Sequence, residues 1–67
     1  MAENKLGTLI RAYRKELKLT QKELSKKLGV GESTVRMWEL GKNYPTFPVL
    51  IRLLNILHIP ADKLMEC

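Results

Sequence analysis

Apolar side chains recur along most of this chain at the three- and four-residue spacing that is typical of amphipathic helices. The first such run extends from about residue 4 to residue 17 and consists of Leu6, Leu9, Ile10, Tyr13 and Leu17. Gly7 lies inside this run, where it lowers helix propensity but would permit the close approach of a neighbouring helix. The pattern predicts a first helix with one face toward a core.

Residues 20–42 predict two short helices joined by a tight turn, and the rest of the chain is organised around them. Thr20 precedes Glu23 by three residues, the spacing of a capping box in which both side chains bind backbone N–H groups at a helix start. Gly29 suits the left-handed conformation that commonly ends a helix. We therefore expect a helix of about two turns between these positions.

The next helix is expected to begin at Glu32, whose negative charge suits a helix N-terminus, and to stop at Gly41. Val35 and Trp38 fall on the face that would turn inward. The opposite face is mostly polar, and a soluble domain has little structural reason to select it. This outward face carries Glu32, Ser33, Arg36, Met37 and Leu40.

Pro45 excludes a helix in the segment that follows, because it lacks an N–H group and disfavours helical geometry at the residue before it. A fourth helix is expected from an N-cap at Thr46 to about His58, which would cap its C-terminus. A short fifth helix is expected over residues 61–65. The sequence thus predicts an all-α protein, a compact five-helix bundle that forms a single domain over residues 1–67.

Composition narrows the class of function. Twelve basic and seven acidic residues among 67 give a formal charge of +5, which favours a polyanionic partner, although a basic surface can also serve solubility alone. No apolar run reaches the roughly 18 residues of a membrane span, and the N-terminus lacks the apolar region of a secretory signal. The lone Cys67 has no partner for an internal disulfide. We expect a cytoplasmic protein with no membrane role.

The residue types needed for catalysis or metal binding are scarce. His58 and Cys67 are the only residues of their kinds, which leaves no metal-ligand spacing and no constellation of nucleophile and base. Gly29 and Gly31 flank a turn that lacks the Lys-Ser/Thr pair of a phosphate-binding loop. We expect no enzymatic activity, no metal, no cofactor and no small-molecule substrate.

Three segments of the chain resemble a known family, namely LTQKELSKKLGV, WELGK and YPTFPVLIRLLNIL. In this order they look like the lambda-repressor-like, Cro/XRE-type helix-turn-helix family of bacterial and phage regulators, and the match extends from Ile10 to Leu64. The resemblance implies five helices, of which the third enters the major groove of DNA, usually in a homodimer on a palindromic operator.

The resemblance also implies roles for individual residues. Positions that face base edges or the adjacent backbone match Glu32, Ser33, Arg36 and Met37. Positions that contact phosphates match Gln21, which also braces the recognition helix, and the loop residues Lys42, Asn43 and Tyr44. For Arg36 the alternative is an i,i+4 ion pair with Glu32 on a solvated face, worth only about 0.2–0.5 kcal/mol.

Arg14 and Glu39 match a salt bridge that ties the first helix to the recognition helix in several members of the family. Two positions depart from the usual pattern: Lys18 stands where the family commonly has Gly, and Gly31 where it has Ser or Thr. The first departure would strain a turn, and the second would leave the recognition helix without a side-chain N-cap.

Taken together, these features predict a sequence-specific, double-stranded-DNA-binding transcriptional regulator that acts as a repressor. The alternative is a protein-interaction module, such as an antitoxin in which DNA binding is secondary or lost, because one fold serves both. The apolar residues expected to have least cover within the domain, and so to form a symmetric dimer contact, are Ile59, Ala61, Leu64 and Met65.

Overall fold

The computed structural model describes residues 5–66, and all of its regular structure is helical. Four α-helices follow one another along the chain: α1 (Lys5–Glu16), α2 (Gln21–Leu28), α3 (Glu32–Glu39) and α4 (Phe47–Leu57). The last segment, Ala61–Glu66, is a 3₁₀-helix, η1, so the short fifth helix that was expected here is not an α-helix and the predicted count of five is not confirmed. Pro60 at its start and a length of six residues favour the i→i+3 pattern, and the amide of Lys63 donates to the carbonyl of Pro60 at 3.0 Å.

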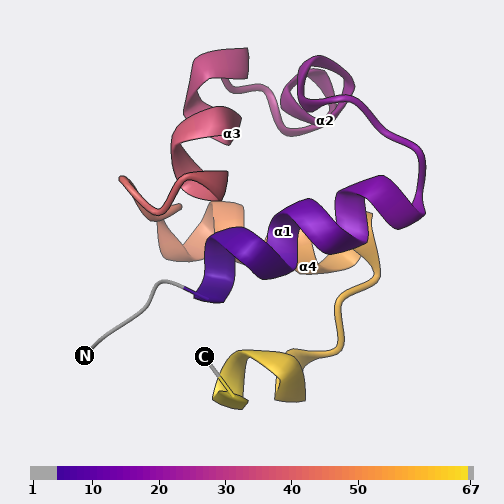
Figure 1. Cartoon of the computed structure of the whole chain (residues 1–67), viewed down its shortest axis with the longest axis vertical. Helices are drawn as coiled ribbons and strands as arrows, with labels where there is room; N and C mark the ends of the chain where they lie inside the picture. The colour runs from indigo at the N-terminus through magenta and orange to yellow at the C-terminus, as the bar shows by residue number, and fades with distance from the viewer. Residues whose placement is uncertain (1–4, 67) are drawn as a thin grey trace.

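The helices pack around one cluster of buried apolar side chains. Figure 1 shows α1 crossing the middle of the molecule in front of α4, with α2 and α3 at one end of the long axis and η1 at the other. The recognition segment predicted from the sequence and the C-terminal segment therefore lie at opposite ends of the fold. Every helix from α1 to α4 contributes to the cluster, which comprises Ile10, Leu24, Leu28, Val35, Trp38, Leu53, Leu57 and Ile59.

The capping box predicted before α2 is present. The hydroxyl of Thr20 accepts a hydrogen bond from the amide of Glu23 at 3.0 Å, and the carboxylate of Glu23 accepts one from the amide of Thr20 at 2.8 Å. Gly31 is the N-cap of α3 and provides no side-chain hydrogen bond, as expected. The capping box therefore fixes the start of α2, whereas α3 begins without a side-chain cap.

All four α-helices end in the same kind of turn. The residue at each turn has a left-handed backbone, with φ between 59° and 79°: Lys18, Gly29, Gly41 and His58. The amide of the residue after it donates to a carbonyl five residues earlier, as in a Schellman motif. In that motif the residue directly after the left-handed one commonly packs back on the helix. At the ends of α1 to α4 these residues are, in order, Leu19, Val30, Lys42 and Ile59. Three of these are apolar and pack in or against the core, whereas Lys42 is exposed.

Gly7 allows α1 to lie directly against the end of α3. A Cβ atom at this position would overlap the carbonyl oxygen of Trp38 and lie 2.9 Å from that of Glu39. Both are backbone atoms, which cannot yield as a flexible side chain can. The expectation that Gly7 permits the close approach of another helix is confirmed.

The expectation of little internal cover was wrong for Ile59, which is 5% exposed and belongs to the core. The turn at His58 folds the chain back, and the Ile59 amide donates to the carbonyl of Leu54 at 2.9 Å. Leu64 is half-buried, whereas Ala61 is exposed and Met65 is 85% exposed. Cys67 lies outside the described residues. No helix in the described part of the chain is long and apolar enough to cross a membrane.

Candidate nucleic-acid interface

The two faces of α3 differ as the sequence predicts. Val35 and Trp38 are 0% and 4% exposed, so they anchor the inner face in the core. On the outer face Glu32, Ser33 and Arg36 are exposed. Two further residues of that face, Met37 and Leu40, are half-buried and exposed respectively. An exposed polar face on a helix whose other side is fully packed is a surface available to a partner.

Gln21, at the first position of α2, lies beside this outer face. It lines an open depression together with Glu32, Ser33 and Arg36. Neither Glu32 nor Arg36 takes part in an ion pair among the residues that the structure describes. The alternative of an i,i+4 pair between them is therefore not realised, and the guanidinium of Arg36 is free to bind another group.

A network of charged side chains sets the position of α3. The carboxylate of Glu39 accepts from Arg14 Nε at 2.6 Å through Oε2 and from Arg14 Nη2 at 3.0 Å through Oε1. Both side chains are largely buried, 10% exposed for Arg14 and 4% for Glu39. This bidentate pairing suits the planar guanidinium, and it is stronger than a pair joined by one hydrogen bond. The pair implied by the resemblance thus joins α1 to the last turn of α3.

The same two residues hold other parts of the helix-turn-helix. Arg14 Nη1 donates to the backbone carbonyl of Leu19 at 2.7 Å, in the link before α2. The side-chain amide of Gln21 donates to Oε1 of Glu39 at 3.1 Å. Its second N–H and its carbonyl oxygen have no partner among residues 5–66. Gln21 is therefore held in place while it keeps polar atoms for a further contact.

The loop residues predicted to contact phosphates lie on the other flank of α3. Lys42, Asn43 and Tyr44 are all exposed, and the last two line a second depression with Thr34 and the start of α4. The predicted site residues thus line two separate depressions, one on each side of α3. Lys42 occupies the turn position that is apolar after the other three α-helices. A charged residue at a position that usually packs inward indicates a role outside the core.

Sequence reasoning missed two residues of α1 near this face. Arg11 and Lys15 line a depression with Gln21, Arg36 and Leu40, on the flank of α3 that faces α1. Their i,i+4 spacing shows that they share a face of α1. The sequence alone does not show which helix that face adjoins.

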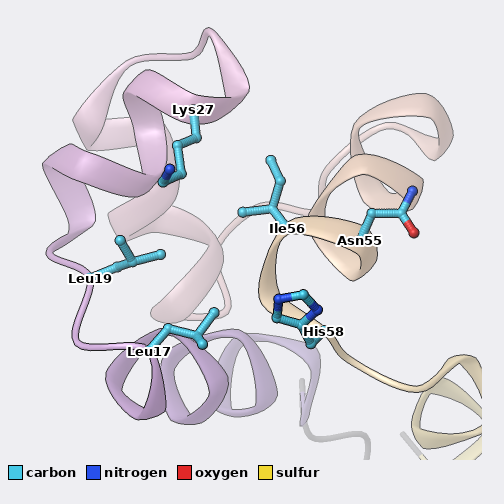
Figure 2. Close-up of a pocket in the computed structure, with 6 residues that line it drawn as sticks. All are labelled: Leu17, Leu19, Lys27, Asn55, Ile56 and His58. Atoms are coloured by element: carbon cyan, nitrogen blue, oxygen red, sulfur yellow. The ribbon is translucent and has the colours of Figure 1, made fainter.

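Figure 2 shows a further depression, between the C-terminal ends of α1, α2 and α4. The side chains of Leu17, Leu19 and Ile56 form apolar walls, with Lys27 and His58 beside them. None of the predicted DNA-contacting residues lies here. In the described residues no three His, Cys, Asp or Glu side chains gather as a metal site would require.

The model of the helix-turn-helix family matches residues 10–64. The chain belongs to this family, the lambda-repressor-like (Cro/XRE-type) helix-turn-helix proteins. The matched span includes α2 and α3, and thus the arrangement described above.

Two curated proteins are similar to the chain. One, named as an uncharacterized HTH-type transcriptional regulator, YqaE, of Bacillus subtilis, is 35% identical over 57 residues, which are 85% of this chain and 49% of that protein. The other, named as an uncharacterized HTH-type transcriptional regulator of Methanothermobacter thermautotrophicus, is 42% identical over 52 residues, which are 78% of this chain and 75% of that protein. The chain thus spans about half the length of the Bacillus protein.

Proposed function

We propose that this helix-turn-helix chain is a cytoplasmic, sequence-specific DNA-binding regulator of transcription that acts as a repressor and lays α3 in the major groove. The observation that carries the proposal is the exposed outer face of α3, with Gln21 fixed beside it through Glu39. Family membership and the printed names of both relatives support a role in transcription. The formal charge of +5 suits a polyanionic partner.

Phosphate contacts and base contacts have separate tasks in this proposal. Gln21, Lys42, Asn43 and Tyr44, on the two flanks of α3, bind phosphates and set the orientation of the protein. The first turn of α4 adds backbone donors, because Thr46 forms no side-chain cap there. Each of these contacts is independent of base sequence.

The outer face of α3 reads the bases. Arg36 is suited to guanine, whose two acceptors fit a guanidinium. Glu32 can accept from the amino group of cytosine, Met37 can contact the methyl group of thymine, and Ser33 can bind either kind of edge. No catalytic step or cofactor is involved.

The regulator binds a palindromic operator as a homodimer. Ala61, Leu64 and Met65 contribute to the dimer contact, and the burial of Ile59 gives it a structural task instead. Because η1 lies at the end of the molecule away from α2 and α3, a contact there leaves the outer face of α3 uncovered (Figure 1).

Selection of preferred duplexes from a random library tests the proposal, since the selected site reports sequence, symmetry and half-site spacing together. Binding to the selected duplex should then fall steeply with salt, because each phosphate contact releases counterions. Failure to enrich any duplex would contradict the proposal.

A second candidate function is a protein-interaction module such as an antitoxin. It is favoured by the apolar side chains left on the surface, above all Phe47 at 72% and Met65 at 85% exposed. A flat salt response, with no preferred duplex, would support this function over DNA binding.

A further inference from the structure

We propose that Arg11 and Lys15 extend the DNA-binding surface onto α1 by contacting phosphates beside the edge of the major groove that α3 occupies. The inference rests on the proposed DNA binding and assigns two further residues to it. The sequence alone gives these side chains no role beyond that of solvated charges.

The geometry places both residues next to the reading helix. They are exposed, one turn apart on α1, and line the same depression as Gln21, Arg36 and Leu40. Gln21 and Arg36 also line the adjoining depression, which contains Glu32 and Ser33. The surface is therefore continuous from the outer face of α3, across Gln21 and Arg36, to α1.

The residues that line this depression carry more positive than negative charge. The positive charge of Arg14 is matched by Glu39, with which it forms a buried pair. Arg11, Lys15 and Arg36 take part in no ion pair among the described residues. Within residues 5–66, three cations without an ion-pair partner therefore surround one depression, and their mutual repulsion is relieved when an anion binds.

The chemistry of the site fits a phosphodiester backbone. Long, flexible Arg and Lys side chains at the rim of a shallow depression can reach successive phosphates, which carry one negative charge each. When α3 lies in the major groove, the sugar-phosphate backbone of one DNA strand runs along a flank of α3. Asn43 and Tyr44 line a depression on one flank of α3, and Arg11 and Lys15 provide cations on the other.

The test compares two double variants that lower the net charge equally. R11A/K15A removes the proposed contacts, whereas K27A/R52A removes two cations at the C-terminal end of α2 and on α4, where Arg52 donates to the carbonyl of Lys27 at 3.3 Å. Lys27 lines the depression of Figure 2, away from the predicted DNA-contacting residues. Circular dichroism and thermal melting establish that each variant is folded. If R11A/K15A fails to fold, R11Q/K15Q replaces it.

Affinity for the selected duplex is measured between 50 and 300 mM salt. We expect R11A/K15A to bind roughly tenfold or more weakly at about 0.1 M salt and to lower the slope of log affinity against log salt by about 1.8, which is 0.9 for each lost phosphate contact. K27A/R52A should keep the wild-type slope, and both variants should prefer the same bases as the wild type.

Ethylation of single phosphates locates the contacts independently. In each half-site, ethylation of two phosphates should weaken binding of the wild-type protein but not of R11A/K15A. Equal losses of affinity and slope in the two double variants would overturn this inference and leave DNA binding intact. If the wild-type protein binds no duplex, the proposed function fails together with the inference.

Discussion

The carboxylate of Glu39 receives two hydrogen bonds from the guanidinium of Arg14, at 2.6 and 3.0 Å, although 25 residues separate them. Glu39 is in the last turn of α3, where the helix dipole disfavours a negative charge. The guanidinium offsets that cost and also holds the carbonyl of Leu19. One side chain of α1 therefore fixes both the end of the recognition helix and the entry to α2.

Arg14→Ala should destabilise the protein by about 3–5 kcal/mol, because it leaves the carboxylate of Glu39 buried without its partner. Urea denaturation followed by circular dichroism measures the change. Lys15→Ala is the control, since Lys15 is exposed on the same helix, and its effect should stay within about 0.5 kcal/mol. Equal unfolding midpoints for the two variants would mean that the pair does not stabilise the fold.

Gly7→Ala should destabilise the protein by about 1–3 kcal/mol, although alanine is the better helix former. The added methyl group would overlap the carbonyl oxygen of Trp38 and force α1 away from α3. Thermal melting measures the loss. Thr8→Ala, at the next and exposed position of α1, should be neutral or slightly stabilising. A stabilised Gly7→Ala protein would show that α1 can shift without cost.

Interactions between close neighbours in the chain could be predicted from the sequence. The capping box of Thr20 and Glu23 spans three residues, so the sequence determines it almost alone. The turn at Gly29 is local in the same way. The Arg14–Glu39 pair spans 25 residues, and only the family resemblance indicated it.

What could not be predicted depends on which surfaces meet in three dimensions. Ile59 was misjudged because it follows the last α-helix, although the turn at His58 folds it back into the core. A left-handed residue followed by an apolar one is the signal that would have indicated this burial. Arg11 and Lys15 were missed because helical spacing shows that they share a face but not that the face borders α3.

Lys18→Gly should stabilise the protein by about 1 kcal/mol. Lys18 has a φ of 59°, a left-handed conformation that costs a side-chain-bearing residue energy and glycine almost none. Lys15→Gly tests the opposite case, because Lys15 lies within α1, where glycine is a poor helix former. This variant should be less stable than the wild type by about 1 kcal/mol. Chemical denaturation of the two variants should shift the midpoint in opposite directions, and a destabilised Lys18→Gly protein would refute the expectation.

Arg36→Ala should relax the base preference at one position of each half-site and cost about 1–3 kcal/mol on the preferred duplex, because a guanidinium that binds guanine through two donors carries sequence information. Lys42→Ala is the matched control, since it removes a cation expected to bind phosphate and should weaken binding to all duplexes by a similar factor. Repeating the duplex selection with each variant distinguishes the two effects. An Arg36→Ala protein that selects the wild-type sequence unchanged would exclude this side chain from base reading, and its exposed position would then be assigned to the phosphate contacts.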